Sequence, residues 1–357
     1  MAEITDLTKM VEMGRRIYNG KLFEKKDDNG KVLLSDEQAI KALCESTFTK
    51  NGSIPSIDKL RSFNALIVEV ANEEAQAKIQ PIIDAVSNYS KVDRYATKLY
   101  QIPKRAKVSM ALSASGTGVD FVRITPSMKQ KPAVPKNHQF GAYYNIDEMI
   151  SDPVNSFRKA VDYVVEWKVK YIFKQLFVLI GQAKTNSQIP TKQLVEKANI
   201  TLADFRKAEG SLLRYGNNVS PILIADRNLI DSLAEKQLTE GMGTLGKEQY
   251  FGTDELRTEL LRSNQIQKVS RTIAVATDNP FTDDKNSKVD LPVNEGLMVA
   301  GGDKSPFYIT EFGTMKTAEG VPDIEDERVN IKVTMTMDIT LIYGQALGYL
   351  KDSAITL

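Results

Sequence analysis

The stretch ERVNIKVTMTMDITLIY, residues 327–343, decides the fold of this chain. Apolar side chains at every second position from Ile331 to Tyr343 alternate with mostly polar ones such as Lys332 and Thr334. This period of two predicts a long β-strand with one buried face. At about 3.3 Å per residue the strand spans on the order of 40 Å, well beyond the roughly 17–20 Å of a common strand. An element of similar length must pack beside it.

A candidate partner is a helix that begins at Asp152 and Pro153. Aspartate is a preferred N-cap, and proline is best tolerated at the first helical position. From there to about Gly181, apolar residues recur mainly at intervals of three and four, and charged residues fill much of the rest. The pattern predicts one amphipathic helix of roughly 40 Å at about 1.5 Å per residue. A long helix along a long β-ribbon suits a plate-like building block better than a compact enzyme core.

Composition narrows the class of protein. The 357 residues are 42% hydrophobic, which is enough for one or two sizeable cores and suggests about two domains. With 47 basic and 46 acidic residues, no net charge draws the chain in bulk to nucleic acid or to an anionic membrane. No apolar run approaches the roughly 20 residues of a spanning helix, and the first residues lack a signal-peptide core. We therefore expect a protein made in a cytoplasm, with no membrane partner.

Cysteine and histidine, which catalytic and metal sites often use, each occur once. The single cysteine, Cys44, excludes an internal disulfide and a site of several thiolates. It shares a helical face with Ile40 and Phe48, which predicts a buried small side chain rather than a nucleophile. The single histidine, His138, is expected to be solvated in a polar loop. We predict no catalytic residue, no metal site and no cofactor.

Three further patterns resemble functional motifs and are interpreted as surface features. Three glycines within residues 241–246 match a dinucleotide-binding pattern, but they follow a helical stretch where that motif requires a strand. The acidic residues within 278–290 lack the spacing and the glycine of a calcium loop, so a solvated hairpin is expected. The glycosylation patterns at Asn199 and Asn218 mean little without a secretory route.

The first half of the chain is predicted to be helical and then β-rich. Residues 1–55 hold short helical patterns between turn-rich segments, which favours an extended arm without a core of its own. Residues 56–97 carry helical spacing, with a kink or restart at Pro81. Residues 98–150 predict a two-stranded ribbon with a polar tip. Because such a ribbon is marginal alone in water, it must lie on something else.

The second half alternates predicted helices and short strands. A helix begins at Thr201, the strand PILIAD covers residues 221–226, and helices follow over 227–236 and 253–262. Three more strands are expected at RTIAVATD, EGLMVAGG and SPFYITEFG. This order predicts one compact α/β lobe inserted between the long helix and the long strand.

The order of elements resembles the tailed-phage major capsid protein family, the Hong-Kong-ninety-seven-type fold. Two segments carry the local likeness. IPTKQLVEKANITLADFRKAEGSLLRYGNNVSPILIADRNLIDSL (189–233) is similar to the segment that enters the family's axial domain, and ERVNIKVTMTMDITLIYGQALGYLKDSAITL (327–357) is similar to its C-terminal peripheral strand and return. The resemblance covers nearly the whole chain in order. It rests on topology and local sequence character, since the family has no short diagnostic motif.

The resemblance implies an α+β fold, the major capsid protein fold of tailed phages, with an inserted α/β axial domain. Its expected parts are an N-terminal arm (1–55), a helical segment that joins the arm to the peripheral domain (56–97), an extended β-ribbon or E-loop (98–150), a spine helix of the peripheral domain (151–184), the axial domain (185–322), the long peripheral strand (323–341) and a C-terminal return to the axial domain (342–357).

The same resemblance implies a structural function rather than an enzymatic one. Members of the family assemble as pentamers and hexamers into an icosahedral head shell that encloses the double-stranded DNA of a tailed phage. The expected location is therefore the virion, after assembly in the host cytoplasm. Expected partners are further copies of the chain, scaffolding and portal proteins, possible decoration proteins, and DNA through weak non-specific contact.

Residues expected at contacts between subunits form two groups. The ribbon contributes aromatic and apolar residues, with lysines that face acidic neighbours: Phe121, Ile124, Lys129, Lys131, Lys136, Phe140, Tyr143 and Tyr144. The segment at the start of the long strand contributes charged residues: Asp323, Glu325, Asp326, Glu327 and Arg328. The alternative for each of these is an ordinary solvated side chain.

Other functions stay open at the level of sequence. A host-encoded compartment shell of the same fold would store cargo enzymes. A soluble α/β enzyme would work without histidine or cysteine, and Asp226 and Arg227, at the end of a predicted strand, are its most site-like pair. A tail-tube protein or an adhesin would form helical stacks or trimers rather than closed shells.

Overall fold

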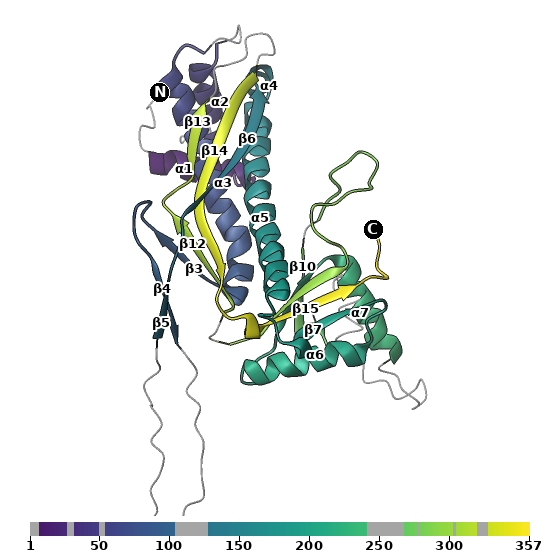
Figure 1. Ribbon diagram of the computed structural model, residues 1–357. Coiled ribbons are helices and arrows are strands. Elements are labelled where there is room, and N and C mark those ends of the chain that lie inside the picture. Colours follow the sequence, from purple (N-terminus) through teal and green to yellow (C-terminus); the bar gives the residue numbers. More distant parts are fainter. Residues whose placement is uncertain are drawn as a thin grey trace, which may run out of the picture.

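The computed structural model describes residues 7–26, 32–49, 54–103, 128–240, 268–277, 279–302, 305–319 and 328–357. Figure 1 shows an elongated part, built on long helices and long strands, with a lobe beside one end of the long helices. The elongated part holds a five-stranded sheet and the lobe holds a six-stranded sheet. Side chains from both parts belong to one hydrophobic cluster, so the two parts share a core.

The predicted long strand is present as β14, Arg328–Leu341. The antiparallel strand β6, Lys136–Asn145, pairs with it from Arg328 opposite Asn145 to Met337 opposite Lys136. Along its other edge β14 pairs with β13, Lys316–Glu319, and then with β12, Phe307–Phe312. The strand β3, Ser87–Val92, lies parallel to β12. Three strands of this sheet, β6, β13 and β12, therefore pair with β14, whereas β3 pairs only with β12.

The burial of β14 changes along its length. From Val329 to Met337 every second side chain is buried, and these apolar residues form the face that the period of two predicts. From Thr336 onward the polar side chains Thr336, Asp338 and Thr340 are buried as well. The prediction of a single buried face is right for the first half of the strand. It is wrong for the second half, where another part of the chain covers the polar face.

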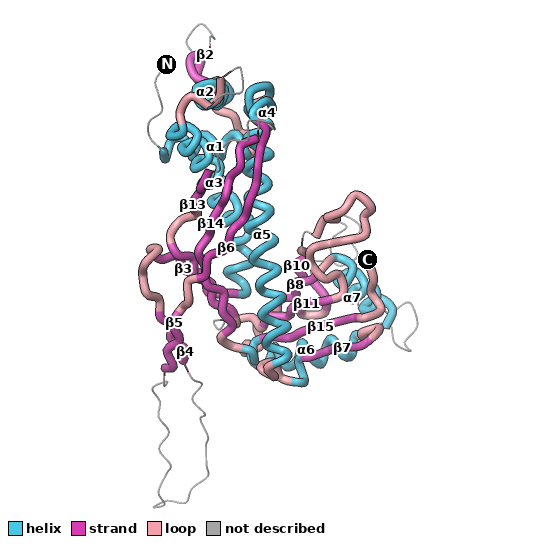
Figure 2. Tube along the Cα trace, turned by 45° about the horizontal axis from the view of Figure 1, so that its top comes forward, coloured by secondary structure: helices cyan, strands magenta, loops and turns pink. Residues whose placement is uncertain are grey.

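The long helix runs as α5, Pro153–Thr185, beside β14 and β6 (Figure 2). The Asp152 carboxylate accepts a hydrogen bond from the Asn155 backbone N–H, which confirms the predicted N-cap. The helix ends at Thr185 rather than at Gly181. Its buried side chains recur at the expected intervals: Phe157, Val161, Val164, Val165, Lys168, Ile172, Phe173, Leu176, Ile180 and Ala183.

A second long helix, α3, Ile57–Val86, packs against α5. It passes position 81 without a break, so the predicted restart at Pro81 is wrong. Ile79 and Ile83, on either side of this position, are buried in the shared core. Their burial offsets the backbone hydrogen bond that a proline removes from a helix.

A buried ion pair links α5 to the sheet. The Lys168 ammonium lies 3.3 Å from both carboxylate oxygens of Glu311 on β12, and it donates to Asn72 Oδ1 of α3 at 2.5 Å. Tyr89 of β3 donates a short hydrogen bond to Glu311. Burial lowers the pKa of Lys168, and the nearby Glu311 carboxylate opposes that shift. Because a buried pair is costly unless its groups are bonded, this one fixes which face of α5 meets the sheet.

The N-terminal residues pack on their own chain. The helices α1, Leu7–Tyr18, and α2, Asp36–Thr47, flank the short strands β1, Glu24–Lys26, and β2, Val32–Ser35. Side chains of both helices lie in the shared core with α3 and α5: Val11, Met13, Ile17, Ile40 and Cys44. Among the described residues this segment has no separate core, because α3 and α5 of the same chain cover its apolar face.

A buried carboxylate links the two helices of this N-terminal region. The Arg16 guanidinium donates two hydrogen bonds of 2.8 Å to the buried Asp36 carboxylate, which also accepts from the Phe23 backbone N–H. Cys44 is buried, as predicted, and desolvation raises the pKa of its thiol to about 12. The thiol is therefore protonated near neutral pH, as expected for a small side chain in a core.

The lobe has the predicted mixed α/β pattern. Its sheet has the strand order β7-β15-β11-β8-β10-β9. The bounds are β7 Leu194–Lys197, β8 Ile222–Ala225, β9 Lys268–Val269, β10 Thr272–Ala276, β11 Glu295–Val299 and β15 Leu347–Asp352. The lobe also holds the helices α6, Leu202–Tyr215, and α7, Arg227–Glu240, and the short 3-10 helices η1, Thr191–Gln193, and η2, Gly344–Ala346. The helix predicted over 253–262 and the glycines within 241–246 lie outside the described residues.

The lobe ends earlier than expected. The predicted strand SPFYITEFG forms β12, which pairs with β14 and β3 in the other sheet, and β13 follows it there. The expected boundary at residue 322 is therefore too late. In the other direction, β15 leaves β14 and lies between β7 and β11, which is the return expected for 342–357. The local pattern of a short buried strand does not reveal which sheet it joins.

Only the base of the predicted ribbon is described. The strand β4, Leu99–Pro103, pairs with β5, Met128–Pro132, in an antiparallel arrangement. Residues 104–127 lie outside the described residues. The later part of the expected ribbon is β6, which pairs with β14 instead and leads into the short helix α4, Ile146–Ser151. The prediction that 136–145 belongs to the ribbon is therefore wrong.

Replacing Val333 with Asp should prevent soluble folding. Val333 is 1% exposed at the centre of β14, and an unpaired buried carboxylate costs more than the about 2–5 kcal/mol of a large-to-small aliphatic core substitution. Soluble yield and the circular-dichroism melting curve measure the effect. Asn330→Asp is the matched control, because Asn330 is exposed on the same strand and should tolerate the charge. Equal stability of both variants would show that this face of β14 is not buried.

Candidate subunit interface

The ribbon base rests on the polar face of the second half of β14. Tyr100 of β4 is 2% exposed, and its hydroxyl lies 2.7 Å from Thr310 Oγ1 and donates to Asp338 Oδ2 at 3.2 Å. Lys131 of β5 donates to Thr340 Oγ1 at 2.7 Å. These contacts cover the polar side chains for which the sequence pattern predicts exposure to solvent. They hold the start of the ribbon against the sheet.

Apolar and turn contacts extend the same interaction. Tyr100, Ala133 and Phe312 form a small buried cluster beside the hydrogen bonds. Arg94, in the turn between β3 and β4, donates to Thr336 Oγ1 at 3.2 Å. The ribbon base and the turn before it are therefore fixed to β14 at Thr336, Asp338 and Thr340.

Asp338 is the buried carboxylate of this contact. It is 5% exposed, and no cation of the described residues forms an ion pair with it. Desolvation raises the pKa of Asp338, although the Tyr100 hydroxyl, the Val134 backbone N–H and the charge of Lys131 oppose the shift. Because the folded pKa lies above the unfolded value, the folded state holds the proton more tightly. Ionisation of Asp338 therefore lowers stability as the pH rises.

Several predicted contact residues lie outside the described part of the chain: Phe121, Ile124, Asp323, Glu325, Asp326 and Glu327. Lys129 is on β5, opposite Ile102, and its side chain is not described. Lys131 and Lys136 are exposed at the ribbon base and at the start of β6. A role for these residues in contacts between subunits stays a prediction.

Phe140 and Tyr144 face the interior of their own chain. Phe140 stacks on Trp167 of α5 with ring centroids 5.0 Å apart, and the Tyr144 hydroxyl donates to Asn64 Oδ1 of α3 at 2.9 Å. Both residues lie on β6 rather than on a ribbon. Their placement on the ribbon is corrected, because the side chains of alternate β6 residues point toward the long helices.

The histidine prediction also changes. His138 lies on β6, not in a loop, and is half-buried. Its Nδ1 is 2.5 Å from the Tyr171 hydroxyl of α5, and the two rings are in contact. Burial lowers the pKa of His138. The residue therefore joins a strand to a helix, and the proline-containing sequence before it gave no sign of the strand pairing.

The opposite face of β6 and β14 is exposed. Tyr143 is 60% exposed, and the Arg328 guanidinium lies 4.8 Å from its ring centroid, a cation–π contact. Beside them the surface is hollowed over Gly141, with a volume of about 470 Å³. Of the predicted contact residues, Tyr143 and Arg328 are thus brought together on a face that the described residues leave open.

Sequence reasoning missed Tyr100 and Asp338, the centre of the ribbon contact. The available signal was the aspartate itself, since a carboxylate within a run of threonine, methionine and isoleucine is unusual for a strand face in open solvent. The alternation of 327–343 assigned Asp338 to the polar side and offered no indication that β4 would cover that side. Pairing between segments more than 200 residues apart is not visible in a local pattern.

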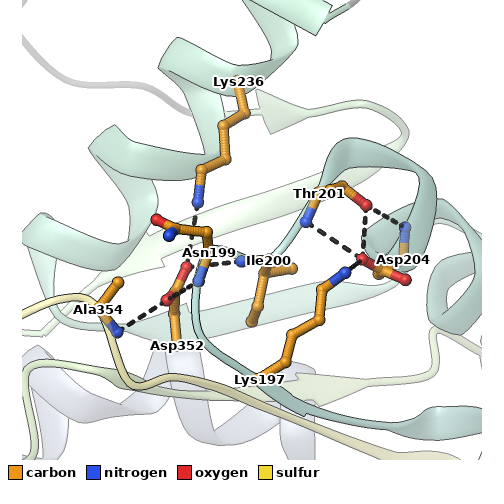
Figure 3. A network of polar contacts seen from close by, with 8 residues as sticks. All are labelled: Lys197, Asn199, Ile200, Thr201, Asp204, Lys236, Asp352 and Ala354. Carbon is orange, nitrogen blue, oxygen red and sulfur yellow. Dashed lines mark hydrogen bonds and ion pairs between the residues drawn. The ribbon is translucent and has the colours of Figure 1, made fainter.

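A second polar network closes the lobe at the end of the chain (Figure 3). The Asp352 carboxylate accepts from the backbone N–H groups of Asn199 at 2.7 Å, Ile200 at 2.8 Å and Ala354 at 3.1 Å, and from Lys236 Nζ at 3.0 Å. Asn199 has φ of 57°, the left-handed region that asparagine tolerates. Desolvation raises the pKa of Asp352, but these hydrogen bonds outweigh it and the pKa is lowered. The ionised carboxylate therefore stabilises the lobe.

Next to this network Thr201 and Asp204 form a capping box at the start of α6. Asp204 also forms a close ion pair with Lys197 of β7, and the hydrogen bonds from Lys197 and Thr201 lower its pKa to about 2. The last strand of the chain, the loop before α6 and the helix α7 are thus bound to one another.

Asp226 and Arg227, the pair considered for an enzyme, form hydrogen bonds that stabilise the lobe. Asp226 caps α7 by accepting from the Asn228 backbone N–H at 2.9 Å, and it accepts from Asn279 Nδ2 at 2.9 Å. Arg227 donates to Asp231 on the same helix. Among the described residues there is no group of three or more histidine, cysteine or acidic residues that could hold a metal ion. In the described ranges, no helix is long and apolar enough to cross a membrane.

Comparison with known proteins identifies the family. The model of the family described as "SPbeta prophage-derived putative capsid protein YonB" matches residues 4–351. The chain belongs to this capsid family. A Bacillus subtilis (strain 168) relative, "SPbeta prophage-derived uncharacterized protein YonB", is 36% identical over 327 residues, which cover 91% of this chain and 94% of the relative. A structural role as a capsid protein follows from this membership.

Solved structures are more distant from this capsid protein. A structure of Microbacterium phage Oxtober96 has a TM-score of 0.48 and 8% identity, and the match covers 75% of this chain and 92% of that one. The satellite phage P4 procapsid, with its size determination (Sid) protein, has a TM-score of 0.47 and 11% identity, covering 84% and 92%. These likenesses concern the fold alone, and the family match carries the assignment.

Asp338→Asn should raise the stability of the capsid protein at neutral pH by about 1 kcal/mol, the usual scale of a single polar substitution. The amide can still accept from Tyr100 and carries no charge to desolvate. The folded pKa of Asp338 is raised, so wild-type stability should fall as the pH rises through it, and the variant should lose that dependence. Denaturant unfolding at several pH values, with the exposed Asp284→Asn as control, measures both effects. An unchanged pH profile would contradict the assignment.

Asp352→Asn should lower the stability of the folded protein, whereas Asp338→Asn should raise it. The folded pKa of Asp352 is lowered, so its contribution is present above the unfolded pKa and is lost as the pH falls through the folded value. At neutral pH the variant should lose about 2–3 kcal/mol, since several hydrogen bonds to a charged group are weakened. The same unfolding series measures it, and Ser353→Asn is the neighbouring exposed control. If Asp352→Asn is as stable as the wild type at neutral pH, the network contributes nothing to stability.

Proposed function

We propose that this protein is the major capsid protein of a tailed phage or prophage. It self-assembles as pentamers and hexamers into an icosahedral head shell that encloses double-stranded DNA. The observation that carries the proposal is the capsid family match over residues 4–351, together with 36% identity across 91% of the chain.

The architecture supports this function. A 14-residue strand and a 33-residue helix lie along each other and give the subunit one long axis. The lobe beside one end and the ribbon base along the sheet supply further surfaces (Figure 2). Because α1, α2, α3 and α5 form a core within one chain, the subunit can fold before it assembles, and its exposed sheet face and ribbon remain for neighbours.

The proposed partners follow from the same function. They are other copies of the chain, scaffolding and portal proteins, and in some shells decoration proteins. DNA is held by weak contact only, which agrees with 47 basic against 46 acidic residues, since each phosphate neutralised adds affinity that hinders packing and release. The protein is assembled in the host cytoplasm and resides in the virion. Contacts by Lys131, Lys136, Tyr143 and Arg328 between subunits belong to this proposal.

Purified protein should sediment as closed particles, or as pentamers and hexamers of subunits of about 40 kDa. Negative-stain electron microscopy should show polyhedral shells, and nucleic-acid assay of particles from infected or induced cells should show DNA inside. A monomer or dimer that stays unassembled with scaffold and crowding agent would contradict the proposal. Shells filled with a cargo enzyme would instead indicate a host compartment.

A further inference from the structure

Gly141 lies in the middle of β6, where no contact within its own chain requires a glycine. Glycine weakens a strand, and in a strand interior it often marks a place where another chain approaches closely. The φ angle of Gly141 is not positive, and a Cβ atom built on it meets nothing within 4 Å. By contrast, Gly296 and Gly348, in the strands of the lobe, have side chains within 3.2 Å of such an atom. Packing explains those two glycines and leaves Gly141 unexplained.

The surface above Gly141 is a shallow hollow on the exposed face of β6 and β14. Gly141 pairs with Lys332, and Tyr143 pairs with Asn330, so these side chains and Gln139 border the hollow. The floor is the backbone of the two strands. With Tyr143 on one side and amide and ammonium groups on the rim, the hollow fits a flat side chain that carries one polar atom.

The same chain presents such a side chain. Tyr95 is 93% exposed, more than any other large hydrophobic side chain among the described residues. It lies in a turn held by a hydrogen bond from the Ala96 backbone N–H to the Asp93 carbonyl oxygen, at 2.9 Å. The preceding residue, Arg94, donates to Thr336 Oγ1, and Gly313 N–H donates to the Val92 carbonyl oxygen at 2.7 Å. Tyr95 is thus held in solvent by an ordered turn, which reduces the entropy that a contact would cost.

The charges of the two places are complementary. The turn carries the exposed carboxylate of Asp93 beside Tyr95, while the Arg94 guanidinium is directed to the sheet. The hollow has Lys332 on its rim and Arg328 over Tyr143 next to it. A turn that exposes a tyrosine and a carboxylate therefore matches a hollow with a basic rim.

We propose that Tyr95 of one subunit inserts into the hollow over Gly141 of a second copy, with Asp93 facing Lys332. The contact rests on the proposed shell function and names one of the surfaces by which copies of the chain join. Tyrosine is among the residues that contribute most to protein interfaces. The missing side chain at position 141 leaves the space that the incoming ring fills.

Disulfide trapping tests the contact directly. One tagged chain carries Tyr95→Cys and a second, untagged chain carries Gly141→Cys, and they are co-assembled and oxidised. The native Cys44 is buried and does not compete. The mixed disulfide should form in assembled particles at least about tenfold above the level in dissociated subunits, as expected for a specific contact at raised local concentration. Phe281→Cys and Tyr163→Cys, at two other exposed aromatic positions, serve as controls. Preferential trapping of either with Gly141→Cys would overturn the proposal.

Filling the hollow gives an independent result. Gly141→Val should leave the melting temperature of the subunit unchanged or raised, because nothing lies within 4 Å of the added carbon, and should lower shell yield about tenfold, the scale of one lost anchor. Thr334→Val, on the same face but outside the hollow, should assemble normally. If Gly141→Val forms shells of normal structure and yield, this contact is rejected, but the proposed function is not. Failure of the wild type to form shells would instead reject the proposed function.

Discussion

The pairing of β14 with three neighbouring strands is the interaction on which the rest of the structure depends. β6 lies along one edge and β13 and β12 along the other, so β14 joins these strands into one sheet. The apolar face of β14 packs into the core that holds α3 and α5, and its far half is covered on the other face by the ribbon base. A strand of 14 residues buried in this way dictates a subunit with one long axis.

Three buried polar contacts fix how the parts of the subunit meet. Lys168 and Glu311 set the face of α5 against the sheet, Asp338 sets the ribbon base against β14, and Asp352 sets the C-terminal strand against the loop before α6. Apolar packing alone tolerates sliding, whereas a buried polar group has few positions in which it is satisfied. A shell subunit repeats its shape in every copy, so geometry fixed by such groups serves its function.

Periodicity predicted the long strand, the long helix with its N-cap Asp152, and the mixed order of the lobe, because each is a local pattern read within one segment. The wrong predictions concern which elements pair or pack with one another. β6 was assigned to the ribbon and β12 to the lobe, because each choice depends on contacts with residues far away in sequence. For the same reason Tyr143 and Arg328 were named from the sequence while Tyr100, Asp338 and the hollow at Gly141 were not.

The central claim is that the subunit folds around β14 by itself and leaves its ribbon and exposed sheet face for assembly. Amide hydrogen exchange, measured by mass spectrometry on free subunits and on closed shells, tests it most directly. Peptides covering Val329–Ile339 and α5 should be strongly protected in both states, whereas peptides covering the turn at Tyr95 should gain protection only in shells. Slow exchange in β14 that appears only after assembly, or no peptide that gains protection in shells, would contradict the account.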